Sequence, residues 1–116
     1  MPSPLDALAD RLRQFAADRD WEQFHSPKNL AMALVGEAGE LAAEFQWMTE
    51  AHSYSPDEAQ RARIRAEAAD VLNYLLRLAD KLGIDLIAAA HEKIEVNAAR
   101  YPVDKVRGSS KKYTEY

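Results

Sequence analysis

The chain has 116 residues, enough for one domain, with a net charge of −4 and no cysteine. This mild acidic balance argues against nucleic acid or an anionic membrane as a partner, and the absence of cysteine excludes disulfides and thiolate metal sites. Because no segment resembles a secretion signal or an apolar membrane span, we expect a cytoplasmic protein.

Helix signals recur along the first half of the chain, whose apolar residues are mostly Ala and Leu, two strong helix formers. Ser3-Pro4 predicts the start of a first helix, and its apolar residues repeat at helical spacing as far as Phe15. Residues 20–25 break this pattern and are predicted to form a loop. Ser26-Pro27 then predicts a second helix, with an apolar stripe that continues to Met48.

Two further helices are predicted in the second half. Ser55 and Glu58 have the spacing of a capping box at the start of the third helix, and Gly83 can end it in a left-handed conformation. Asp85 can cap the fourth helix, which should run to about Tyr101 before Pro102 stops it.

Four helices joined by short links predict an all-α four-helix bundle. We expect a single domain over residues 1–116, with an irregular basic tail over about 103–116. A chain of this size buries only a modest core, so self-association is expected to help stabilise it.

Four acidic residues lie on or beside the apolar stripes of the second and third helices, where apolar residues would be usual. Glu37 lies on the apolar stripe of the second helix, and Glu67 lies on that of the third. Glu40 and Asp70 each follow one helical turn later. Each helix therefore presents a pair of carboxylates at the edge of its buried face, where an unpaired charge is costly.

Two outcomes can relieve this charge. Basic residues can neutralise the acids, as in a non-catalytic helical interaction protein whose acids form salt bridges between subunits with Arg63, Arg65, Lys93 or Arg100. Alternatively, divalent cations can bind, and ligands that offer only oxygen suit Mg²⁺ or Mn²⁺. Di-iron bundles need Glu-x-x-His on two helices, and this chain has that spacing only once, at Glu22 and His25.

The acid pattern and several longer motifs resemble the all-α MazG-like nucleoside triphosphate pyrophosphohydrolases, in particular their dCTP pyrophosphatase branch. The resemblance covers nearly the whole chain. The motifs that carry it are Asp20-Trp21-Glu22-Gln23-Phe24-His25, Asn29-Leu30, Gly36-Glu37-Ala38-Gly39-Glu40-Leu41, Phe45-Gln46-Trp47, Glu67-x-x-Asp70-Val71-Leu72, Tyr74-Leu75, Lys93, Asn97, Arg100-Tyr101-Pro102 and Lys112-Tyr113-Thr114-Glu115.

This resemblance implies a hydrolase that cleaves dCTP, or a modified dCTP, between its α and β phosphates and so cleans the nucleotide pool. It implies a homotetramer built as a dimer of dimers. The implied Mg²⁺ ligands are Glu37, Glu40, Glu67 and Asp70; the implied catalytic residues are Glu37, Glu40 and Lys93; and the implied substrate-binding residues are Trp21, His25, Trp47, Asp70, Tyr74, Lys93 and Asn97.

One position departs from the family pattern. Relatives in this branch carry a histidine in the first helix where this chain has Leu12. If that histidine helps to hold the substrate, its replacement bears on the preferred base. In the basic tail, Lys111 and Lys112 are candidates to stabilise the departing pyrophosphate.

Overall fold

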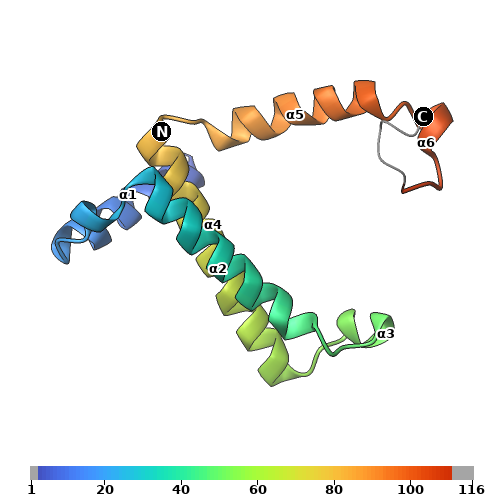
Figure 1. Cartoon of the computed structure of the whole chain (residues 1–116), viewed down its shortest axis with the longest axis horizontal. Helices are drawn as coiled ribbons and strands as arrows, with labels where there is room; N and C mark the ends of the chain where they lie inside the picture. Colours follow the sequence, from blue (N-terminus) through green and yellow to red (C-terminus); the bar gives the residue numbers. More distant parts are fainter. Residues whose placement is uncertain (1–2, 111–116) are drawn as a thin grey trace. The chain divides into compact units, whose positions relative to one another are not determined.

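The computed structural model describes residues 3–110, and the chain divides into two compact units, residues 1–83 and 84–116. Every regular element within the described residues is helical, which confirms the all-α prediction (Figure 1). The four long predicted helices are present in the expected order. Their assembly into a four-helix bundle and a single domain over residues 1–116 stay predictions.

The first unit contains five helical elements. They are α1 (Pro4–Asp18), the 3₁₀ turn η1 (Glu22–Phe24), α2 (Pro27–Phe45), the short α3 (Glu50–Ser53) and α4 (Glu58–Leu82). The predicted loop over residues 20–25 therefore contains one 3₁₀ turn, in which the backbone N–H of Phe24 donates to the carbonyl of Trp21. The short α3 lies in the polar stretch that separates the second and third predicted helices.

The predicted helix starts are confirmed for α1 and α2 and need one correction for α4. Ser3 and Ser26 each accept a hydrogen bond from the backbone of the third helical residue. The predicted capping box of Ser55 and Glu58 is wrong, because Asp57 caps α4 in a reciprocal pair with Gln60. The Asp57 carboxylate accepts from the Gln60 N–H at 2.8 Å, and a carboxylate there also complements the positive end of the helix dipole.

The small core lies where α4 packs against α1 and along α2 (Figure 1). Its buried apolar residues come from all three helices: Ala9, Ala16, Leu30, Leu76 and Ala79. Gly83 ends α4 at φ 66°, a left-handed conformation that glycine adopts without a steric cost, as predicted. The long α2–α4 pairing places the middle of each helix beside the other, and both predicted pairs of acids lie in this region.

The second unit contains α5 (Leu86–Arg100) and the four-residue α6 (Val103–Val106). Asp85 caps α5 by accepting from the backbone N–H of Ala88, which confirms that prediction. The segment after Pro102 was expected to be irregular, yet it contains α6, because the Pro102 carbonyl accepts from Lys105 and Val106. Lys111 and Lys112 lie outside the described residues. Within residues 3–110, no helix is both long and apolar enough to span a membrane.

Candidate active site

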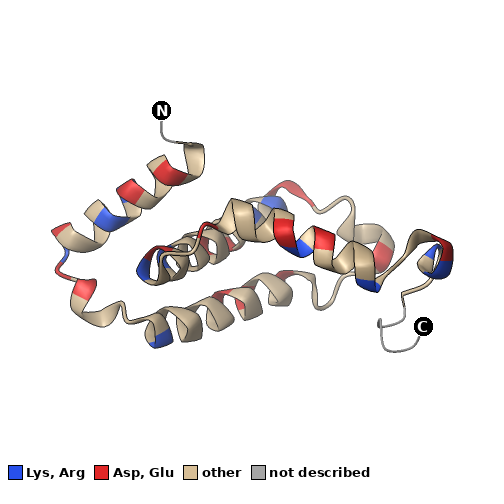
Figure 2. Cartoon of the chain, turned by 90° about the horizontal axis from the view of Figure 1, so that it is seen from above, with Lys and Arg blue, Asp and Glu red and all other residues tan. Residues whose placement is uncertain are grey.

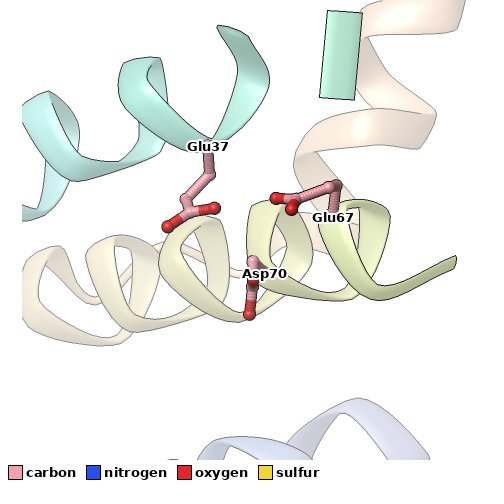
Figure 3. Close-up of side chains that lie close together, drawn as sticks. All are labelled: Glu37, Glu67 and Asp70. Carbon is pink, nitrogen blue, oxygen red and sulfur yellow. The ribbon is translucent and has the colours of Figure 1, made fainter. Parts of the chain in front are cut away.

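Three of the four predicted acids converge between α2 and α4. Oxygen atoms of Glu37, Glu67 and Asp70 all lie within 4.8 Å of one another. Figure 3 shows Glu37 reaching from α2 toward α4, where Glu67 and Asp70 lie one helical turn apart. We call these three residues the acid cluster. Glu40 is exposed on α2, one turn beyond Glu37.

The acid cluster has no ion pair with a basic residue among the described residues of the first unit. On α2 the only basic residue is Lys28 in the first turn, and the acidic residues all lie in the second half of the helix (Figure 2). Arg63 lies one turn before Glu67 on α4, but its Nε donates to Glu44 at 3.0 Å and not to the acid cluster. The charge of the cluster is therefore left without a counter-charge within this unit.

Burial makes this charge costly for the acid cluster. The Oε2 atoms of Glu37 and Glu67 are closed off from water and have no hydrogen-bond partner among the described residues. Burial, followed by the neighbouring carboxylates of Glu40 and Asp70, raises the pKa of Glu37 to about 7. Burial and the carboxylate of Glu40 raise the pKa of Glu67 as well. Orphaned carboxylate oxygens that face one another are the donor set that a hard divalent cation requires.

A pocket of about 440 Å³ lies in the same unit and includes Asp70 in its wall. It is lined by α1, by the turn around η1 and by one face of α4: Leu8, Arg11, Leu12, Phe15, Ala16, Trp21, His25, Asp70, Asn73, Tyr74 and Arg77. The acid cluster and the pocket thus share Asp70, which places the acid cluster next to a cavity. Leu12, the position that departs from the family pattern, is part of the pocket wall.

Three of the predicted nucleoside-binding residues line this pocket together. The ring of Trp21 packs edge-on against Phe15, with the ring centroids 5.7 Å apart, and its centroid lies 6.5 Å from that of His25. Tyr74 lies one turn after Asp70 on the same face of α4. The pocket therefore combines flat aromatic surfaces with the carboxylate of Asp70 in its wall.

Three further predicted substrate residues, Trp47, Lys93 and Asn97, belong to other elements of the chain. Trp47 follows the end of α2 and is 89% exposed, which leaves its indole free to meet another molecule. Lys93 and Asn97 lie on α5 in the second unit, and both are exposed. Their predicted contacts with substrate stay predictions.

A buried arginine in the pocket wall was not predicted. Arg77 on α4 is only 5% exposed, and its Nη2 donates to Glu22 Oε1 at 2.7 Å and to His25 Nδ1 at 3.2 Å. The carboxylate of Asp80 lies 3.5 Å from its Nη1, and Lys81 pairs with Glu22 as well. The signal was present in the sequence: Arg77 lies seven residues after Asp70, two turns along the same helix face.

The comparisons with known proteins agree with this geometry. The model of the MazG-like family matches residues 33–116, which is more than half of the chain. The chain therefore belongs to the MazG-like family, and the family prediction is confirmed.

Particular relatives are also similar over most of the chain. Human dCTP pyrophosphatase 1 is 49% identical over 120 residues, covering 97% of this chain and 69% of the human protein. The protein of the same name from Rattus norvegicus is 48% identical with the same coverage. The crystal structure of a pyrophosphatase from Archaeoglobus fulgidus superimposes with a TM-score of 0.82 at 37% identity, covering 88% of this chain and 95% of that one.

Proposed function

We propose that this protein is a Mg²⁺-dependent nucleoside triphosphate pyrophosphohydrolase that converts dCTP, or a modified dCTP, and water into dCMP and pyrophosphate. The observation that carries the proposal is the acid cluster, in which carboxylate oxygens lie within 4.8 Å of one another and two of them are buried without partners. The relatives named dCTP pyrophosphatase 1 support the substrate. Removal of such nucleotides from the pool is the cellular role that fits this reaction.

Glu37, Glu40, Glu67 and Asp70 would hold the cation, with Mn²⁺ as a possible substitute. The donor set fits, because it consists of carboxylate oxygens without any nitrogen or sulfur ligand. When bound, Mg²⁺ screens the negative charge of the phosphates and lowers the pKa of a bound water. The bound cation would also hold the four carboxylates in their ionised form. Without a cation, the pKa of Glu37 is about 7.

The protein groups supply positioning and proton transfer. Glu37 or Glu40 would orient or deprotonate the attacking water, since both lie on the α2 side of the cluster. Lys93 would stabilise the departing pyrophosphate. Trp21, His25 and Tyr74 would bind the nucleoside in the pocket, while Trp47 and Asn97 would complete the substrate contacts.

We further propose that the active form is a cytoplasmic homotetramer, built as a dimer of dimers. Its support is apolar surface that neither unit covers by itself. On α2, Met32 is 65% exposed and Val35 is 68% exposed, although both would be usual in a core. No residue of α5 is buried.

The non-catalytic alternative is disfavoured by how the basic residues are used. Arg63 was a candidate to neutralise the acids of a neighbouring subunit, but it is paired with Glu44 of its own chain. A protein with structural acids would need other cations to compensate the four carboxylates.

The experiment that tests the function is an assay of pyrophosphate release from dCTP, with and without Mg²⁺. We expect pyrophosphate release that requires Mg²⁺ and that is fastest with dCTP or a modified dCTP in a panel of common nucleotides. No pyrophosphate from any nucleotide in the panel would exclude the enzyme. Equal rates with every base would exclude the proposed substrate preference.

A further inference from the structure

The contact between Arg77 and His25 constrains the state of the histidine ring. A guanidinium group carries N–H donors and no acceptor, so its Nη2 can only donate to His25 Nδ1, 3.2 Å away. A ring nitrogen that accepts a hydrogen bond carries no proton. The ring must therefore be neutral, with its one proton on Nε2.

The charges around His25 favour the same state. From α4 the ring faces Arg77 and Lys81, and from η1 it faces Glu22. Glu22 already accepts from both cations, so an additional positive charge on the ring would have no carboxylate of its own. Burial, then the charge of Arg77, lowers the pKa of His25 below its ordinary value.

The hydrogen-bonding capacity of the ring is then only half used inside the chain. Within the described residues, His25 Nδ1 accepts from Arg77 and no partner of Nε2 is present. Both residues line the pocket that is shared with Asp70. The Nε2–H group is therefore available as a donor to a bound molecule.

We propose that Arg77 is a positioning residue that holds His25 as the neutral Nε2–H tautomer, so that the pocket offers a fixed N–H donor to an acceptor atom of the base. This inference rests on the proposed function for the identity of the ligand. A cytosine base offers a carbonyl oxygen and an unprotonated ring nitrogen as acceptors. A base with an N–H group at the same place would meet donor against donor and bind more weakly.

The test observes the ring directly, in the full chain without nucleotide or Mg²⁺. Long-range ¹H–¹⁵N NMR spectra report the tautomer and the pKa of each histidine, and comparison with His25→Gln identifies the signals among the three histidines. We expect the Nε2–H tautomer in the unsubstituted protein and a pKa below 6.5. In Arg77→Met we expect mixed tautomers and a higher pKa than in the unsubstituted protein, because the charge of Arg77 is one of the causes that lower it.

Arg13→Met is the matched control. Arg13 also donates to a carboxylate on α4, at 2.8 Å from Asp80, but it does not contact His25. This substitution should leave both the tautomer and the pKa of His25 unchanged. In the active enzyme at about pH 8, the KM of Arg77→Met for dCTP should be several-fold higher than that of the unsubstituted protein, because part of the neutral ring lacks the Nε2–H donor, while kcat changes little and the KM of Arg13→Met stays unchanged.

An Nδ1–H tautomer or a charged ring at neutral pH in the unsubstituted protein would overturn the inference, whether or not Arg77→Met folds. An unchanged ring in folded Arg77→Met would overturn it as well. The expected ring spectra together with no hydrolysis of dCTP would count against the proposed substrate and leave the positioning role of Arg77 intact.

Discussion

The charged residues of α4 belong to two groups, and the chain itself supplies opposite charges to only one of them. In the first, which we call the arginine network, Arg77 and Lys81 both contact Glu22, and Asp80 accepts from Arg13. In the second, the acid cluster, the carboxylates of Glu37, Glu67 and Asp70 lie close to one another, and none of them pairs with a basic residue among the described residues of the first unit. Both groups include partly or fully buried atoms, and their α4 members Asp70 and Arg77 lie about two turns apart.

The difference teaches which feature of a buried charge indicates a ligand. Burying a charge is costly in either group, and in the arginine network the chain itself supplies the opposite charge. In the acid cluster that charge is missing within the first unit, and Glu37 responds with a pKa of about 7. The missing counter-charge, more than burial alone, therefore indicates a site for an external cation.

The largest expected effect separates the two groups by function. Asp70→Asn removes one carboxylate from the acid cluster and should lower kcat/KM for dCTP by at least about 100-fold, because a cation ligand is lost. The metal-free protein should be no less stable, because the substitution relieves repulsion between like charges. Enzyme assays and thermal unfolding in a chelator measure both quantities.

Glu44→Gln is the control for that substitution. Glu44 lies on the same half of α2 as Glu37, but it is paired with Arg63 and lies outside the acid cluster. Its loss should leave activity nearly unchanged. If Asp70→Asn instead unfolds the protein while turnover per folded molecule is kept, then the acid is structural.

A substitution in the arginine network should lower the stability of the metal-free protein, whereas Asp70→Asn should not. Arg77→Met leaves Glu22 with one cation fewer beside a buried site and should lower the free energy of unfolding by about 2 kcal/mol, a value reduced because Glu22 is partly exposed. Denaturant unfolding measures the change. Arg13→Met, at an exposed position, should change stability much less. Equal losses of unfolding free energy in Arg77→Met and Arg13→Met would show that burial does not increase the contribution of Arg77 to stability.

A smaller effect concerns the dependence of stability on pH. Because the pKa of Glu37 is about 7 in the folded chain and 4.5 is its ordinary value, the folded state binds more protons than the unfolded state between these values. The free energy of unfolding of the metal-free protein should therefore rise as the pH falls from about 8 to about 6.5. Saturating Mg²⁺ should remove this trend, because it holds the carboxylates ionised.

The lower limit of that pH window is set by His25. Its pKa is lowered in the folded chain, so below 6.5 the unfolded state binds the extra proton of His25, which opposes the further gain from Glu37 and flattens the rise in stability. Melting temperatures measured in a chelator and in Mg²⁺ test both signs. A metal-free melting temperature that increases from about pH 6.5 to pH 8 would contradict the proposed charge imbalance.

The smallest effect is expected for the exposed ion pair next to the acid cluster. Arg63→Met removes the contact with Glu44, and exposed pairs of this kind contribute only about 0.5 kcal/mol. Denaturant unfolding should therefore detect little change. A loss as large as that of Arg77→Met would mean that Arg63 also compensates the acid cluster.

The sequence predicted the local structure and the acid cluster well, because both follow from short-range spacing. Helix starts at Ser3 and Ser26, the end at Gly83 and the inward position of Glu37 and Glu67 all depend on residues within one or two turns. The cap of α4 was misassigned by two residues, because Ser55 and Asp57 are both good caps and only the backbone geometry selects between them.

Long-range contacts were not predictable in the same way. Arg77 meets Glu22 and His25 across more than 50 residues of sequence, and nothing in the local spacing of η1 identifies that partner. The burial of Arg77 depends on how α4 packs against the turn that follows α1. A helical pattern shows which face a residue lies on, but not which distant segment covers that face.

The uninterrupted course of α4 has a consequence for how the protein can vary. Asp70 and Arg77 belong to one helix of 25 residues, so their separation is fixed at about 10 Å by the rise of 1.5 Å per residue. Inserting one residue between them would lengthen this span only slightly, but it would rotate Arg77 by about 100° away from the pocket. Insertions should therefore be far better tolerated in the turns around α3 than between these two positions of α4.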